Sequence, residues 1–317
     1  VSHFNDDIYY LAIYNPYGNH NVDAVYRKIG QRTEQPFQMM GNIEQKITVS
    51  IGVANYPESA RNSLEIINCA EIVQSQKKES GTNSIAYFEA PILTDFIENI
   101  QMENKLKEAI EDHAFELYYQ PQYDAGSKKL RGVEALIRWR GQDGKFVSPA
   151  VFIPLAEKDG LIVQIGNWVL EEGIRVYADW YQKYGYPMVL SLNISALQYK
   201  KADFVHHLLV LIEKYQVDPA LIELEITESV LIEDFNSVVD KLNTLKEYGI
   251  KISLDDFGTG FSSLSYLKGL PIDTLKIDKS FIDTVINDHP TRVITESIIA
   301  MVKKLGCETV AGGVGEK

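Results

Sequence analysis

The fold is decided by residues 221–256, which read LIELEITESVLIEDFNSVVDKLNTLKEYGIKISLDD. The apolar positions at the start of this stretch predict a strand over 221–227. Leucines and valines then recur at helical spacing and predict an amphipathic helix over 234–249, and a further apolar run predicts a strand over 251–256. A strand, a helix and another strand in this order are typical of a parallel sheet that is covered by helices.

The same alternation extends in both directions along the chain. Further strands are predicted at 115–121, 130–138, 188–194, 273–278 and 308–314, and further helices at 161–184, 203–216 and 292–305. So many strand and helix units within roughly 200 residues predict an α/β fold of the TIM-like (β/α) barrel type. An open, doubly wound sheet is the alternative fold.

The segment before the barrel has a different pattern. It is predicted to hold a β-branched strand, a helix, a short strand and a charged amphipathic helix at 47–54, 63–79, 84–88 and 94–112. Pro91 interrupts this pattern, which places a boundary near residue 90. We therefore expect two domains, at 1–90 and 91–317.

Polar side chains lie near the ends of successive predicted strands. They are Glu134, Asn193, Glu225, Asp255, Asp256, Lys276 and Asp278. In a barrel the carboxyl ends of the strands converge on one mouth, where active sites lie. Carboxylates gathered there would repel each other unless Mg²⁺ or Mn²⁺, which prefer oxygen ligands, lay between them. The histidines of the chain fall elsewhere, which argues against a histidine-based zinc site.

Carboxylates, an amide and a lysine around such metals suit phosphoryl chemistry. Two metal ions can activate a water and stabilise the leaving oxygen of a phosphoester. The residues alone therefore predict a metal-dependent phosphoester hydrolase. A metal-dependent enolising or aldol enzyme on the same fold is the alternative, because one fold hosts many reactions.

Composition excludes several classes of function. Of the 317 residues, 45% are hydrophobic and 24% are charged, which is typical of a globular protein. The formal net charge of −13 disfavours a nucleic-acid polymer as partner, because its phosphates would be repelled. No apolar run is long enough to span a membrane. The chain has two cysteines, Cys69 and Cys307, which suits a reducing compartment. We therefore expect the protein in the cytoplasm. A membrane or sensor segment upstream of Val1 is left open.

At its polar strand ends the chain resembles the EAL domain family of cyclic di-GMP phosphodiesterases, over about residues 94–317. The matching stretches, in order, are Tyr118–Pro121 (YYQP), Glu134–Arg138 (EALIR), Asn193–Ser195 (NIS), Glu225–Glu228 (EITE), Asp255–Leu264 (DDFGTGFSSL) and Lys276–Phe281 (KIDKSF). Each stretch alone is a weak signal. Together, in this order and at family-like spacing, they are highly specific.

The resemblance implies a metal site and a catalytic set. Glu134, Asn193, Glu225 and Asp255 resemble the ligands of one metal ion, and Asp255 with Asp256 resembles the bridge toward a second. The implied catalytic residues are Lys276, Glu134 and Asp255. Lys276 resembles the lysine that orients the attacking water or the scissile phosphate.

The resemblance also implies contacts with the substrate, through Gln120, Leu136, Arg138 and Asp278. Arg138 resembles a residue that clamps a phosphate, for which a guanidinium is suited by its bidentate geometry. Gln120 resembles a residue that contacts guanine. Glu228 resembles a carboxylate that holds the loop 256–264, which in the family couples metal binding to dimer contacts.

The implied reaction is the hydrolysis of cyclic di-GMP to linear pGpG in bacterial second-messenger signalling. The implied cofactor is Mg²⁺ or Mn²⁺ in a two-metal site. Ca²⁺ is expected to inhibit, because its longer and looser oxygen shell would disturb that site. A homodimer formed through the EAL domain is implied as well.

Residues 1–90 resemble the C-terminal half of a GGDEF domain, an α+β cyclase domain often found ahead of an EAL domain. The resemblance rests on Thr48–Ala54 (TVSIGVA), a following helix and Gly81–Asn83 (GTN). The signature position falls at Phe4–Ile8 (FNDDI), where both glycines are replaced. Those glycines would let the backbone approach the phosphates of GTP, so we expect no cyclase activity and leave GTP binding open.

The chain departs from the EAL pattern in its last motif. Where the family has Ala-Glu-Gly-Val-Glu, this chain has Ala311–Gly315 (AGGVG), so Gly312 replaces a glutamate that positions the catalytic water or acts as its base. The last barrel strand is also missing before Lys317. Three interpretations stay open: an incomplete form of an active enzyme, a catalytically silent receptor for cyclic di-GMP, or a native end that has Glu at 312. A scaffold that binds no ligand is disfavoured by the intact carboxylates.

Overall fold

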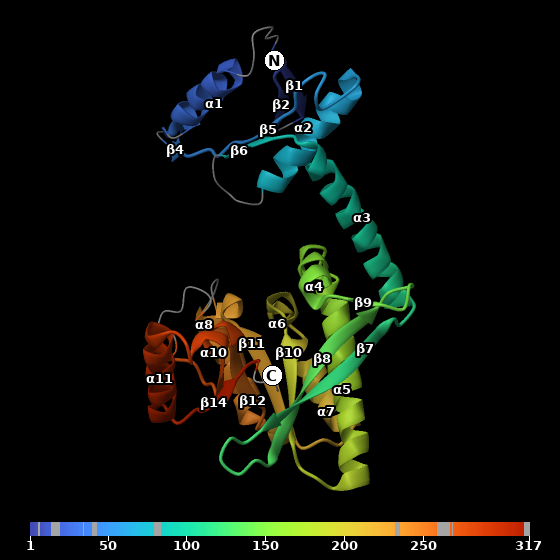
Figure 1. Ribbon diagram of the computed structural model, residues 1–317, viewed down its shortest axis with the longest axis vertical. Coiled ribbons are helices and arrows are strands. Elements are labelled where there is room, and N and C mark those ends of the chain that lie inside the picture. The colour runs from blue at the N-terminus through green and yellow to red at the C-terminus, as the bar shows by residue number, and fades with distance from the viewer. Residues whose placement is uncertain are drawn as a thin grey trace. The chain divides into compact units, whose positions relative to one another are not determined.

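The computed structural model describes residues 1–5, 7–13, 20–33, 35–39, 43–78, 84–231, 235–258, 267 and 269–313 (Figure 1). The chain divides into two compact units, which we call unit 1 (Val1–Gln101) and unit 2 (Met102–Lys317). Within the described ranges, no helix combines the length and the apolar character that crossing a membrane requires.

Unit 1 consists of short strand pairs and helices. The antiparallel pairs are β1 (Ser2–Asn5) with β2 (Ile8–Tyr10) and β3 (Phe37–Met39) with β4 (Ile43–Gln45), and the parallel pair is β5 (Ser50–Val53) with β6 (Ser84–Tyr87). The helices are α1 (His20–Thr33), α2 (Ser63–Lys78) and α3 (Ala90–Glu111), the last of which continues into unit 2. Helix α2 packs closely on β5, since a Cβ at Gly52 would lie 1.9 Å from the carbonyl oxygen of Ala70.

Unit 2 is built around a curled sheet that forms a half-barrel. Its strands, in spatial order, are β14 (Glu308–Ala311), β13 (Thr274–Ile277), β12 (Lys251–Phe257), β11 (Ile222–Thr227), β10 (Val189–Ile194), β8 (Leu130–Arg140) and β7 (Phe115–Tyr123). The short strand β9 (Phe146–Val147) pairs with β8 outside this path. All neighbours from β8 to β14 are parallel. The predicted α/β class and a barrel-like curvature of the sheet are confirmed.

Strand β7 departs from the wholly parallel sheet that the sequence suggested. It pairs antiparallel with β8, from Phe115 opposite Trp139 to Tyr123 opposite Leu130. Only residues 124–129 join the two strands. A parallel pair needs a crossover of a dozen residues or more, so this short turn permits only a hairpin.

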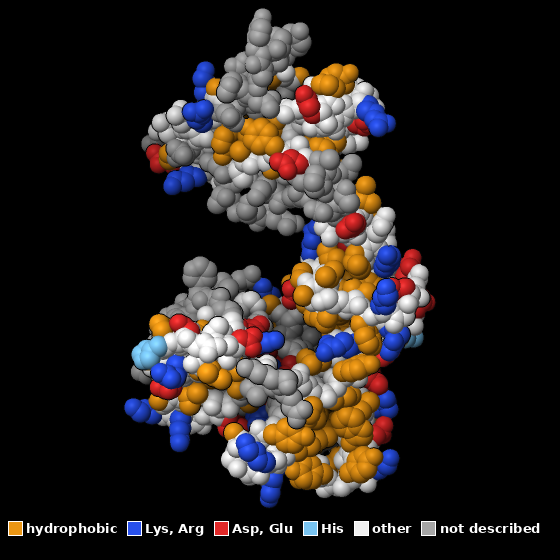
Figure 2. Space-filling model, viewed as in Figure 1, with side chains coloured by type: hydrophobic (Ala, Val, Ile, Leu, Met, Phe, Trp, Pro, Cys, Tyr) orange, Lys and Arg blue, Asp and Glu red, His pale blue; other side chains and the backbone are white. Residues whose placement is uncertain are grey.

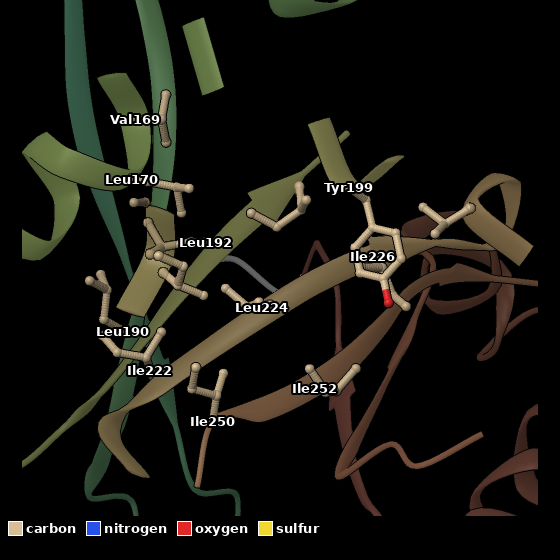
Figure 3. Close-up of a cluster of buried hydrophobic side chains, with 14 of the residues drawn as sticks. Val169, Leu170, Leu190, Leu192, Tyr199, Ile222, Leu224, Ile226, Ile250 and Ile252 are labelled. Atoms are coloured by element: carbon tan, nitrogen blue, oxygen red, sulfur yellow. The ribbon is translucent and has the colours of Figure 1, made fainter. Parts of the chain in front are cut away.

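Helices cover the outer face of the sheet. They are α4 (Pro149–Lys158), α5 (Ile162–Tyr184), α6 (Ala196–Lys200), α7 (Phe204–Lys214), α8 (Phe235–Glu247), α10 (Lys279–Thr284) and α11 (His289–Lys304), with the short 3₁₀ turns η1 (Pro219–Leu221) and η2 (Glu228–Leu231). Helices α5, α8 and α11 contact β10, β12 and β14. Between sheet and helices lies the core, where Leu190, Leu192, Ile222, Leu224 and Ile252 are buried (Figure 3). The alternate residues of these strands face the inner side.

A buried polar network lies on that inner face, around Glu223. The Glu223 carboxylate accepts hydrogen bonds from Arg131 Nη1 (3.2 Å) and Nη2 (2.8 Å), Thr274 Oγ1 (2.7 Å) and Ser191 Oγ (2.8 Å). Arg131 reaches the inner face because the pairing of β8 with β7 shifts register at this point, and such a bulge re-aims a side chain. The network thereby links β8, β10, β11 and β13.

The lower end of unit 2, around the start of β8 and the end of α5, exposes several tyrosines. They are Tyr123, Tyr181, Tyr184 and Tyr186. Figure 2 shows hydrophobic side chains gathered over this part of unit 2. The Tyr186 hydroxyl donates a hydrogen bond to the carbonyl oxygen of Leu130 at 2.9 Å, which ties the loop after α5 to the start of β8.

Candidate active site

Three carboxylates meet at the carboxyl ends of the parallel strands. Glu134 on β8, Glu225 on β11 and Asp255 on β12 each place one carboxylate oxygen within 4.8 Å of the other two. They meet because all three occupy inner-face positions near the same end of the sheet, while the residues between them point into the core. The structure thus brings together three predicted metal ligands that are far apart in the sequence.

Lys276 on β13 lies between these carboxylates. Its Nζ donates to Glu225 at 2.8 Å and to Glu134 and Asp255 at 3.0 Å each. The side chain is buried, with 6% of the residue exposed. Burial disfavours the charge of Lys276, but the carboxylates of Glu225, Glu134 and Asp255 outweigh it and raise the pKa of this ammonium above its ordinary value. The lysine therefore stays charged at physiological pH.

Glu225 has the least compensated carboxylate of the cluster. Burial raises its pKa well above the usual range; the charge of Lys276 opposes this rise, and Glu134 and Asp255 add to it. Its Oε1 atom is buried and has no hydrogen-bond partner among the residues that the structure describes. A bare carboxylate oxygen in the interior is costly unless a cation or a donor meets it. This oxygen and its carboxylate neighbours fit a hard divalent metal ion, which takes oxygen ligands.

The other two predicted ligands lie beside this cluster. The Asn193 side chain donates from Nδ2 to Glu134 Oε1 at 3.0 Å. The backbone N–H of Asp256 donates to Asp255 Oδ1 at 2.9 Å, and Asp256 has a φ of 55°, which is uncommon for a residue other than glycine. Burial, and then the charges of Asp255 and Asp278, raise the pKa of Asp256. A metal contact by either residue stays a prediction.

The predicted substrate residues of β7 and β8 share the inner face. Gln120 stands directly opposite Glu134 in the antiparallel pair, and Leu136 and Arg138 follow Glu134 at two-residue steps along β8. Arg138 donates from Nη1 to the carbonyl oxygen of its neighbour Ile137 at 2.9 Å. These residues therefore continue the face of the carboxylate cluster along β8 toward its carboxyl end.

Asp278 and Glu228 have structural partners of their own. Asp278 Oδ1 accepts a hydrogen bond from the backbone N–H of Ser280 at 2.9 Å, and the bonds from Ser280 lower the pKa of Asp278. This aspartate thereby caps the start of α10. Glu228 Oε1 accepts from the N–H of Gly258 at 3.3 Å, which ties η2 to the end of β12. The predicted loop 256–264 continues into residues 259–264, which lie outside the described residues.

Gly312 follows the end of β14. Lys276 pairs with Val310 and Ile277 pairs with Ala311, so position 312 shares the inner face with Lys276. A Cβ at Gly312 would lie 3.2 Å from the carbonyl oxygen of Ile277. A side chain fits at this position if the backbone of Ile277 shifts by a few tenths of an ångström. Because residue 312 is glycine, this position contributes no side chain to the mouth of the half-barrel.

The network around Glu223 was not predicted from the sequence. A signal for Glu223 was present, because it precedes Glu225 by two residues in a strand and so faces the same side. Arg131 gave no such signal. It faces inward only because of the bulge in β8, and this depends on pairing with β7.

A family model described as EAL domain matches residues 103–317. The signaling protein YkoW of Bacillus subtilis is 39% identical over 94% of this chain and 37% of its own length. The bifunctional diguanylate cyclase/cyclic di-GMP phosphodiesterase MucR of Pseudomonas aeruginosa is 37% identical over 90% of this chain and 42% of its own length. The chain thus spans less than half the length of either relative.

The fold also matches solved structures. The structure described as PaMucR phosphodiesterase in complex with c-di-GMP is 39% identical to this chain and superposes with a TM-score of 0.65. The match covers 68% of this chain and 88% of the PaMucR chain. The structure of the EAL enzyme Bd1971 with cAMP and cyclic di-GMP bound is 30% identical to this chain and superposes with a TM-score of 0.67. The match covers 81% of this chain and 68% of the Bd1971 chain.

Proposed function

The chain belongs to the EAL domain family, and on this premise we propose that it hydrolyses cyclic di-GMP to linear pGpG, in a metal-dependent reaction of bacterial second-messenger signalling. The observation that carries the proposal is the convergence of Glu134, Glu225 and Asp255 around Lys276 at the strand ends. The relative MucR, which is named as a cyclic di-GMP phosphodiesterase and has a structure in complex with c-di-GMP, supports the choice of substrate.

Five residues are proposed to hold two metal ions. Glu134, Asn193, Glu225 and Asp255 would bind one ion, and Asp255 with Asp256 would face the second. Their oxygen donors favour Mg²⁺ or Mn²⁺, and Ca²⁺ is expected to bind without supporting turnover. When bound, such ions neutralise a phosphate and lower the pKa of a water.

Lys276, Glu134 and Asp255 are the proposed catalytic residues. The ammonium of Lys276 is fixed by hydrogen bonds to carboxylates on β8, β11 and β12, so its position is set by the sheet itself. A buried, charged donor held in this way can orient an attacking water or stabilise charge on the phosphate with little reorganisation.

The substrate contacts are proposed along β7 and β8. Arg138 would clamp a phosphate oxygen through its guanidinium, and Gln120 and Leu136 would contact a guanine base and the ring between the phosphates. Asp278 would contact the substrate from the start of α10. Glu228 would hold the end of β12 in place, consistent with its bond to Gly258.

The decisive experiment is an incubation of the protein with cyclic di-GMP and Mg²⁺ or Mn²⁺, followed by chromatographic separation of the nucleotides. We expect pGpG to accumulate, and EDTA or the substitution Glu134→Ala to abolish it. Glu296→Ala, which changes an exposed residue of α11, is the matched control and should leave turnover unchanged. Absence of pGpG while cyclic di-GMP still binds would contradict the hydrolase.

A second candidate function, that of a catalytically silent receptor for cyclic di-GMP, is favoured by Gly312. The inner-face position after β14 carries no carboxylate, and the family's glutamate is expected there. We predict that Gly312→Glu raises turnover, by up to roughly 10²- to 10⁴-fold if the glutamate acts as a general base. A wild-type protein that binds cyclic di-GMP without cleaving it, beside an active Gly312→Glu variant, would establish the receptor.

Residues 1–90 are proposed to be the C-terminal half of a GGDEF-like domain without cyclase activity, joined to an EAL domain at 91–317. The support is that MucR, named as a diguanylate cyclase as well, aligns over 287 residues of this chain, which is longer than the EAL match. A homodimer through the EAL domain and a cytoplasmic location complete the proposal. Light scattering of the purified protein would test the dimer.

A further inference from the structure

The inner face of β7 carries an aromatic side chain that the proposed roles do not use. Leu117 and Tyr119 point toward α5, where the Tyr119 ring lies edge-on to Trp180 with centroids 4.6 Å apart. Because side chains alternate along a strand, Tyr118 between them faces the opposite side, together with Gln120. Tyr118 therefore lies on the same face as the carboxylate cluster.

Tyr118 pairs with a second exposed ring. Phe146 on β9 lies edge-to-face with Tyr118, with ring centroids 5.6 Å apart and an interplanar angle of 84°. The two residues are 46% and 45% exposed. Edge-to-face packing fixes the two rings relative to each other and leaves part of each available to a ligand.

Two guanidinium groups flank these rings. Arg140 Cζ lies 4.5 Å from the Phe146 ring centroid, and Arg138 Cζ lies 5.8 Å from the Tyr118 centroid. Arg140 is held by Glu116, with Nε–Oε1 at 2.6 Å and Nη2–Oε2 at 3.2 Å. A bidentate pair of this kind limits the rotation of the arginine, so the surface is preformed.

The position of the rings relative to the carboxylates suggests their ligand. Tyr118 stands opposite Leu136, two residues beyond Glu134 on β8. At the usual rise of a strand, this places Tyr118 about 7 Å beyond Glu134 along the same face. A nucleotide whose phosphate lies at the carboxylates can thus direct its base toward the two rings. The guanidinium groups of Arg138 and Arg140 beside the rings would then attract the negative charge of the nucleotide.

We propose that Tyr118 and Phe146, flanked by Arg138 and Arg140, form a stacking platform for one guanine base of cyclic di-GMP. The proposal rests on the proposed function and adds a base subsite outside the metal cluster. Stacking on aromatic faces tolerates any base, so the platform supplies affinity for the base without selecting it. Hydrogen-bonding groups such as Gln120 would select guanine.

The test is calorimetric titration of the full chain with cyclic di-GMP in Ca²⁺, which is expected to prevent turnover. Removing one ring by Tyr118→Ala or Phe146→Ala should weaken binding by about 5- to 150-fold. Tyr118→Phe should restore most of the affinity, because stacking requires the ring and not the hydroxyl. In Mn²⁺, Tyr118→Ala should raise KM much more than it changes kcat, since the carboxylate cluster is intact.

Tyr123→Ala is the matched control, because Tyr123 is an exposed tyrosine of the same strand at its far end, 63% exposed. Its affinity should equal that of the wild type. Wild-type affinity in the folded Tyr118→Ala and Phe146→Ala variants, or an equal loss in Tyr123→Ala, would overturn the platform. Failure of the wild-type protein to bind cyclic di-GMP would instead overturn the proposed function, and the platform with it.

Discussion

At the scale of single residues, the most constrained side chain is Lys276. Its ammonium separates three carboxylates, of which Glu225 is fully buried. Replacing it with methionine would leave these charges facing each other, and breaking a buried ion pair typically costs about 3 to 5 kcal/mol. We predict that Lys276→Met loses roughly this much unfolding free energy in EDTA and less in Mn²⁺, because a bound cation compensates the carboxylates. Denaturant titrations in the two buffers measure both values.

Lys303→Met is the control for this experiment, because Lys303 is exposed near the end of α11. Its stability should change little in either buffer. A loss in Lys276→Met that is the same with EDTA and with Mn²⁺ would show that the cluster does not bind the cation. The comparison therefore tests the metal site without relying on catalytic activity.

At the scale of the strands, the Glu223 network should make unit 2 sensitive to acid. Burial opposes the charge of Glu223, but the bonds from Arg131, Thr274 and Ser191 outweigh it and lower the pKa of this carboxyl. A carboxyl with a lowered folded-state pKa stabilises the protein above its unfolded-state pKa of about 4.3, and this contribution is lost as the pH falls through the folded-state pKa. Glu223→Gln should therefore lower stability at neutral pH and flatten the acid dependence.

Denaturant unfolding between about pH 7 and pH 3 would show this effect as a smaller pH slope in the variant. Glu308→Gln serves as a comparison, because Glu308 also bonds to Arg131 but is largely exposed and should contribute much less. Equal slopes for the wild type and Glu223→Gln would contradict the role of the network.

The approach of β8 to β10 depends on Gly132. A Cβ at this position would lie 2.3 Å from the carbonyl oxygen of Val189, so any side chain must push the two strands apart. We predict that Gly132→Ala destabilises unit 2 by about 1 to 3 kcal/mol, the usual cost of overpacking. Gly126→Ala, in the turn before β8, meets only a side-chain atom at 3.6 Å and should be tolerated. The shift in denaturation midpoint measures the difference, and equal midpoints would contradict it.

The same scale shows what the sequence could predict. The helix predicted at 161–184 and the strand predicted at 251–256 are found at 162–184 and 251–257, because hydrophobic periodicity is a local property of the chain. The antiparallel pairing of β7 and the inward aim of Arg131 depend on register between strands, which periodicity does not specify. Glu134, Glu225 and Asp255 were predicted together because parallel strands end at one edge.

At the scale of the whole chain, the two units differ in their cores. Among the described residues, unit 1 contributes only Ala60, Cys69 and Val73 to the buried hydrophobic set, whereas unit 2 has a continuous core. Because stability rises with buried apolar area, we expect unit 1 to unfold at lower denaturant than unit 2. The chain offers a probe for each, since Cys69 lies in unit 1 and Cys307 in unit 2.

Thiol labelling along a denaturant series would separate the two transitions, using Cys307→Ser to report on Cys69 and Cys69→Ser to report on Cys307. Burial raises the pKa of both thiols, so each should react slowly while its unit is folded and quickly once it unfolds. We predict that Cys69 becomes reactive at a lower denaturant concentration than Cys307. Coincident midpoints would contradict this prediction and would mean that the two units unfold cooperatively.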